Sequence, residues 1–177
     1  NSETDLSQDA SLTVGKNSRV QVNVSQGTLG KGAMGYQVVD GAKLRLGDQA
    51  AVDVSLKDAK TDGEVEGIDT FSSAQVEAGD NAAIYLQMEN SQVKEADGLC
   101  VSDLGTLGLG KYASVALQME NSPVDTVMGI NVDHAKATLG DHASLSIEAD
   151  GNSVAAEGQG IWGIIASDAG TLEVGNG

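Results

Sequence analysis

The sequence predicts an all-β fold, a right-handed, single-stranded parallel β-helix (β-solenoid) of about five and a half coils with about 31 residues per coil. Three observations predict it. Glycine recurs in two series at nearly constant spacing, apolar residues alternate between these glycines, and only 3% of the 177 residues are aromatic. A core of small branched side chains suits a narrow interior lined by strands. No segment carries the apolar stripe of a long helix.

Each coil is expected to hold three short strands, which in the first coil fall near residues 12–14, 20–24 and 35–38. Alternation with a period of two indicates a strand with one buried face. The first and second strands flank a glycine of the first series, and the third strand contains a glycine of the second series. The first series is Gly15, Gly47, Gly79, Gly110, Gly140 and Gly175, and the second is Gly35, Gly67, Gly98, Gly129 and Gly163.

Equivalent residues of successive coils should stack in columns about 4.8 Å apart. One such column is Leu12, Leu44, Val76, Leu107, Ala137 and Leu172. Residues 11–177 form these repeats, and residues 1–10 are expected to be a polar leader that is flexible or pairs with a neighbour. Both ends of the solenoid should present open strand edges, so we expect the chain either to be part of a longer solenoid or to stack on other copies.

Two other architectures compete with this one. A solenoid with two coils per repeat would show similarity at half the period, but the two glycine series divide the repeat unequally. Antiparallel blades or a sandwich would need systematic tight turns between paired strands. Asp40-Gly41 and Asp62-Gly63 are such turn sequences, yet they occur at different phases of the repeat.

The formal net charge of −16 argues against nucleic acid and anionic membranes as partners. No stretch is long and apolar enough for membrane insertion. Cys100 is the single cysteine, so no intrachain disulfide can form. It falls on the outward phase of the third strand, and we expect an inert or semi-exposed thiol.

Acidic residues form the candidate metal site. Glu89 and Glu120 belong to twin segments, LQMENS, in adjacent coils, and Asp150 follows them in the next coil. Carboxylates stacked this closely repel one another, and a Ca²⁺ ion with oxygen ligands would relieve that repulsion. The competing interpretation, which we favour, is a solvated acidic edge. Ca²⁺ is the only cofactor that the sequence suggests.

Trp162 is the candidate ligand-binding residue. It lies in a three-residue expansion of the repeat and could stack on a sugar, although local packing is the simpler role. No residues indicate catalysis. His134 and His142 fall in turns without a nucleophile beside them, and the sequence GTLGLGK at residues 105–111 lacks the Ser or Thr of a P-loop, having Tyr112 instead. We therefore expect a protein that is not an enzyme.

Four segments carry a family resemblance: AKLRLGDQAAVDV, GTLGLGKYASVAL, MGINVDHAKATLGDHASLSI and WGIIASDAGTLEVG. Their shared pattern resembles the passenger domains of bacterial autotransporters of the pertactin-like type, over about residues 11–177. The resemblance implies a right-handed β-helix that is exported to the bacterial cell surface and acts as an adhesin.

These observations lead to three functional hypotheses. The first is an extracellular structural or adhesive segment, a scaffold or adhesin stalk, whose partner is a surface molecule of a host or neighbouring cell. The alternative is a fibre subunit that stacks end to end on other copies of itself through its open ends. The third is a carbohydrate-binding or carbohydrate-active β-helix, which the mostly small or neutral outward residues disfavour.

Overall fold

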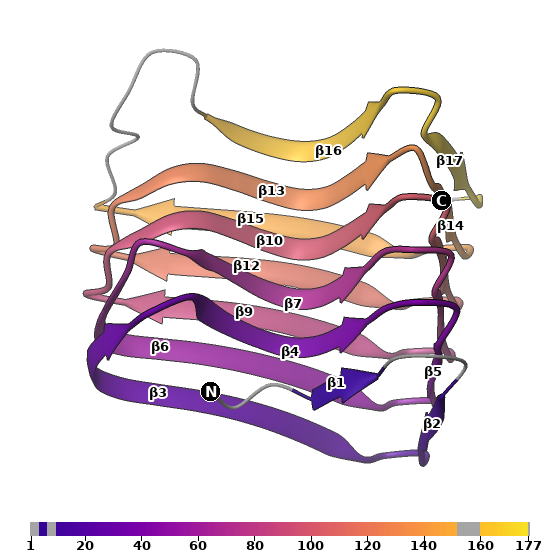
Figure 1. The fold of residues 1–177 in the computed structure, drawn as a ribbon, viewed down its shortest axis with the longest axis horizontal. Helices are drawn as coiled ribbons and strands as arrows, with labels where there is room; N and C mark the ends of the chain where they lie inside the picture. The colour runs from indigo at the N-terminus through magenta and orange to yellow at the C-terminus, as the bar shows by residue number, and fades with distance from the viewer. Residues whose placement is uncertain (1–3, 7–9, 152–159, 177) are drawn as a thin grey trace.

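The computed structural model describes residues 4–6, 10–151 and 160–176 and confirms the β-solenoid (Figure 1). Within these residues every regular element is a strand, and no helix is present that could cross a membrane. The chain winds through three parallel sheets, named A, B and C, and places one strand in each sheet per coil. In Figure 1 the strands of sheet A run in front from left to right and those of sheet C run behind from right to left while the chain climbs, which is a right-handed coil.

The strand bounds follow the repeat. Sheet A consists of β1 (Thr4–Leu6), β4 (Gly32–Val38), β7 (Glu64–Thr70), β10 (Val93–Ser102), β13 (Val124–Asp133) and β16 (Ile161–Ser167). Sheet B consists of β2 (Ser11–Val14), β5 (Lys43–Leu46), β8 (Gln75–Ala78), β11 (Thr106–Leu109), β14 (Lys136–Leu139) and β17 (Thr171–Val174). Sheet C consists of β3 (Arg19–Leu29), β6 (Ala51–Thr61), β9 (Ala83–Glu89), β12 (Ser114–Glu120) and β15 (Ser144–Asp150).

The register confirms the predicted columns. In sheet B, Leu12 pairs with Leu44, Leu44 with Val76, and the column continues through Leu107 and Ala137. Because the pairs fall in step in all three sheets, like side chains meet like along the solenoid. The core between the sheets contains small and branched side chains, and the largest fully buried ones are Leu44, Leu56, Ile68, Ile84, Leu86, Met88, Leu99, Leu117, Met119, Ile130, Val38 and Val52.

Two details go beyond the expected pattern. Strands β3 and β6 each span 11 residues because they continue past the corner between sheets C and A, where Gln26 and Asp58 adopt a left-handed conformation with φ of 56° and 51°. In the leader, β1 pairs in parallel with β4 of the same chain. These three leader residues therefore extend sheet A by one strand.

The turns between sheets B and C also stack. Asn17, Gln49 and Asn81 each adopt a left-handed conformation there, and their N–H groups donate to carbonyls of the next coil at 2.8–3.0 Å. The neighbouring glycines of the first series let the turns of successive coils pack directly on one another. A Cβ on Gly79 would lie only 2.7 Å from the backbone nitrogen of Asp48 in the preceding coil. Backbone pairing is thus continuous from the sheets into the turns.

Candidate functional site

The predicted acidic column is present in the structure, and a lysine of the preceding coil pairs with its first carboxylate. Glu89 pairs in register with Glu120, and Glu120 with Asp150. In the preceding coil Lys57 is the neighbour of Glu89, and its Nζ contacts both carboxylate oxygens at 2.8 and 2.9 Å. Among the described residues, these three acids do not form a group compact enough to hold a metal ion. Lys57 supplies the positive charge that a Ca²⁺ ion would otherwise bring, so calcium binding here stays a prediction.

The histidines and the P-loop-like segment lie in strand–turn–strand structure. Residues 105–111 comprise β11 and the turn that leads to β12. His134 and His142 both sit in turns, with φ of 48° and 57°. The ring of His142 stacks on Tyr112 with centroids 4.9 Å apart, and His134 Nδ1 lies 3.2 Å from a carboxylate oxygen of Asp133. These contacts give both histidines local structural partners.

Trp162 lies in β16 beside Met128 of the preceding coil and is 36% exposed. Its ring packs near Gly160, where a Cβ would come within 3.3 Å of it. The neighbours Ile161 and Ile164 are also partly exposed in this coil, although their column partners Val127 and Ile130 are buried. Trp162 is therefore available at the surface, and its role as a ligand anchor stays a prediction.

The structure assembles a second site that the sequence analysis did not single out, on the outer side of sheet A. We call it the acid–thiol cluster and define it as Glu66 and Asp69 of β7 with Asp97 and Cys100 of β10. Glu66 pairs in register with Asp97, and Asp69 with Cys100, so the four residues form two pairs across two adjacent coils.

A glycine of the second series places the two pairs on the same face of sheet A. Val65 and Ile68 are both buried although they are three residues apart, so the alternation slips by one residue at Gly67. A Cβ on Gly67 would lie 2.4 Å from the Gly98 carbonyl oxygen and 2.5 Å from Ile84, so only glycine fits this bend. The slip places Glu66 and Asp69 on the same face, as a β-bulge redirects side chains.

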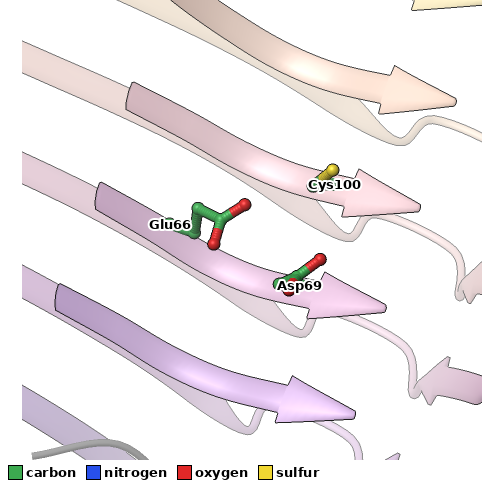
Figure 2. A group of neighbouring side chains, drawn as sticks. All are labelled: Glu66, Asp69 and Cys100. Atoms are coloured by element: carbon green, nitrogen blue, oxygen red, sulfur yellow. The ribbon is translucent and has the colours of Figure 1, made fainter. Parts of the chain in front are cut away.

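The ligand-type atoms of this cluster lie close together. One carboxylate oxygen each of Glu66 and Asp69 and the Sγ of Cys100 all lie within 4.8 Å of one another. Figure 2 shows the two carboxylates projecting from β7 toward β10, with Cys100 on β10 next to Asp69. Asn131 donates to Cys100 Sγ at 3.9 Å, and Gln37 donates to Asp69 at 3.2 Å.

The carboxyls of this cluster are withdrawn from solvent. Glu66 and Asp97 are each 3% exposed, and Met34 and Met128 flank them along the column. Glu66 Oε2 and Asp97 Oδ1 have no hydrogen-bond partner among the described residues. The ion pairs of the described chain leave Glu66, Asp69 and Asp97 without a basic partner. Three carboxyl groups thus lie withdrawn from solvent beside the half-buried thiol of Cys100.

Burial sets the protonation of the acid–thiol cluster. It raises the pKa of Glu66 to about 9, with a further increase from the charges of Asp69 and Asp97. It raises the pKa of Asp97 to about 8, helped by the charge of Glu95. Burial also raises the pKa of Asp69, which the hydrogen bond from Gln37 partly offsets, and that of the Cys100 thiol. At neutral pH Glu66 and Asp97 therefore carry protons for most of the time.

The four residues of the acid–thiol cluster occupy equivalent positions around two glycines of the second series, and this pattern is visible in the sequence. Glu66 and Asp97 immediately precede Gly67 and Gly98, while Asp69 and Cys100 each follow those glycines by two residues. Cys100 was predicted on the outward phase of its strand, and its side chain is half-buried in the structure. A strict period of two would put Glu66 and Asp69 on opposite faces, so the alternation alone does not bring these two acids together.

Sheet C carries a surface hollow of about 370 Å³. Tyr85, which is 42% exposed, lies in it together with Asp53, whose carboxylate is paired with Arg19. The hollow therefore combines an aromatic ring, amides and both signs of charge. Its lining residues are Arg19, Asp53, Tyr85, Leu86, Gln87, Ala116, Leu117, Gln118, Ser146 and Glu148.

No family model, curated protein sequence or solved structure matches this chain. The likeness to autotransporter passenger domains therefore rests on the repeat pattern alone.

Proposed function

We propose that this chain is an extracellular structural and adhesive scaffold, a solenoid segment that presents side chains along its outer faces. The observation that carries the proposal is the unbroken register of three parallel sheets, which turns outward residues into straight columns. A surface of this kind is stiff before a partner arrives, so binding loses little conformational entropy.

The ion pairs are consistent with a structural role. Apart from the pair between His134 and Asp133, each described pair joins a cation of one coil to an acid of the next coil. They are Lys16–Asp48, Arg19–Asp53, Arg45–Glu77, Lys57–Glu89, Lys111–Asp141 and Lys136–Glu173. Such pairs link coils along the axis, while the excess of acid keeps neighbouring molecules apart.

The hollow of sheet C supplies a surface for adhesion to carbohydrate. Tyr85 offers a ring face on which a sugar can stack, and Gln87, Gln118 and Glu148 offer hydrogen-bonding groups. The hollow lies across several coils, as an extended glycan chain would require. We therefore propose surface glycans as the adhesive partner, in keeping with a position outside the cell.

Beads coated with the full chain test the adhesive function. They should adhere to glycan-bearing cell monolayers, and periodate oxidation of the surface sugars should abolish adhesion. Tyr85→Ala should reduce adhesion about five- to thirtyfold, because stacking and burial on one ring contribute on the order of 1–2 kcal/mol. Tyr112→Ala is the matched control, since Tyr112 is 57% exposed and lies outside the hollow. Adhesion that survives periodate, or equal loss in both variants, would refute the glycan role.

End-to-end assembly is the second candidate function. The last described coil exposes Ile161, Ile164 and Val174 at 46%, 39% and 66%, whereas their column partners one coil earlier are buried. A second copy stacked on this coil would cover them, and burial of apolar surface would drive the contact. Sedimentation velocity over a range of concentrations distinguishes the candidates, because a stacking subunit grows into long particles and a lateral scaffold stays monomeric.

A further inference from the structure

We propose that the acid–thiol cluster binds one divalent, thiophilic metal ion of the Zn²⁺ class, with Glu66, Asp69 and Cys100 as ligands. This inference does not depend on the scaffold or adhesive function. It assigns a chemical role to the outer side of sheet A, in the two coils that contain β7 and β10.

The spacing of the ligand atoms fits a small tetrahedral ion. Zn²⁺ binds carboxylate oxygen at about 2.0–2.2 Å and thiolate sulfur at about 2.3 Å, so ligand atoms around it lie about 3.5 Å apart. The oxygens of Glu66 and Asp69 and the Sγ of Cys100 already lie within 4.8 Å of one another. Small side-chain rotations would close that difference without any movement of the strands.

Two buried carboxyl oxygens of the cluster lack a partner that a bound ion could supply. Glu66 Oε2 and Asp97 Oδ1 are buried and have no hydrogen-bond partner among the described residues, although buried polar atoms are normally paired. Both residues are 97% withdrawn from solvent, and they are neighbours in the register. A metal ion bound to Glu66 would satisfy the first of these oxygens.

The donor set selects the class of metal. Ca²⁺ requires six to eight oxygen ligands, and Mg²⁺ keeps most of its water, so neither matches a small site that contains a thiol. A thiolate together with carboxylates suits Zn²⁺ and ions that resemble it, such as Co²⁺. Two surrounding groups already orient the ligands, because Gln37 donates to Asp69 and Asn131 donates to Cys100.

Protons compete with the metal at this site. A thiol or a protonated carboxyl must lose its proton before it can bind the ion. Each loses that proton to solvent on forming its bond to the ion, while the ion keeps its oxidation state. Metal affinity should therefore increase with pH, and binding should release protons.

A titration with Co²⁺ at pH 8 tests the proposal on the full chain. The wild-type chain should develop the near-ultraviolet absorption of a thiolate bound to cobalt, saturating at one ion per chain, and Zn²⁺ should displace it. Cys100→Ser should abolish this absorption, and Glu66→Gln should weaken cobalt binding more than about tenfold, as expected for loss of a ligand. Glu77→Gln is the matched control, because Glu77 lies on sheet B and is exposed.

Thermal denaturation provides the second measurement and shows that each variant is folded. Zn²⁺ should raise the melting temperature of the wild-type chain and of Glu77→Gln, because an ion that binds only the folded state stabilises it. It should leave the melting temperature of Cys100→Ser unchanged. No cobalt–thiolate absorption in the wild type, the same absorption in Cys100→Ser, or no effect of Zn²⁺ on wild-type melting would each overturn the proposal.

Discussion

The buried carboxyl of Glu66 should make the protein less stable as pH rises. Its pKa is raised from 4.5 to about 9 in the folded chain. Between these two values the folded state holds a proton that the unfolded state has lost, so the free energy of unfolding falls with increasing pH. The stabilisation is complete below about pH 4.5 and is lost as the pH passes through about 9.

The size of this effect follows from the linkage relation. One group contributes about 1.4 kcal/mol per pH unit, so Glu66 alone lowers the free energy of unfolding by about 4 kcal/mol between pH 5 and pH 8. Asp97, with a pKa of about 8, acts in the same direction. The charge of one carboxyl affects the pKa of the other, so the combined change in the free energy of unfolding is smaller than the sum of the two separate changes.

Urea denaturation at pH 5, 6, 7 and 8, followed by far-ultraviolet circular dichroism with a chelator present, measures this dependence. Glu66→Gln cannot ionise and keeps the shape of the side chain, so its stability should fall less steeply, by several kcal/mol over this range. Glu120→Gln, at an exposed position, should retain the slope of the wild type. Parallel slopes for the wild type and Glu66→Gln would refute the buried, protonated state of Glu66.

Three further predictions concern the scaffold. Gly67→Ala should destabilise the fold by about 1–3 kcal/mol or more in chemical denaturation, because the added Cβ would lie 2.4 Å from a backbone oxygen. Gly108→Ala is the control and should be neutral or stabilising, because its nearest contact is at 4.0 Å. Ser91→Ala should lower the free energy of unfolding by about 1–3 kcal/mol, because the buried Ser91 hydroxyl accepts an N–H bond at 3.1 Å and donates to a carbonyl at 3.0 Å. Addition of about 1 mM Ca²⁺ should leave the wild-type melting temperature unchanged, because Lys57 Nζ already pairs with the carboxylate of Glu89. A clear increase in the melting temperature would show that the acidic column binds calcium.

The sequence by itself determined the architecture, the length of the coil and the register of the columns. Residues such as Leu44 and Val76 recur at fixed spacing, and parallel pairing of like segments is the arrangement that buries all of them at once. The sequence also placed Glu89, Glu120 and Asp150 in one column, which the structure confirms.

Only the tertiary structure decided which polar residues meet. The repeat places Lys57 in the column of Glu89, but only the structure shows that Lys57 Nζ contacts both carboxylate oxygens of Glu89. Glu66 and Asp69 share a face because the alternation slips at Gly67, which a strict period of two does not reveal. A repeat fixes which residues are equivalent from coil to coil, whereas burial and distance within a coil depend on its bends, and those depend on packing between the sheets.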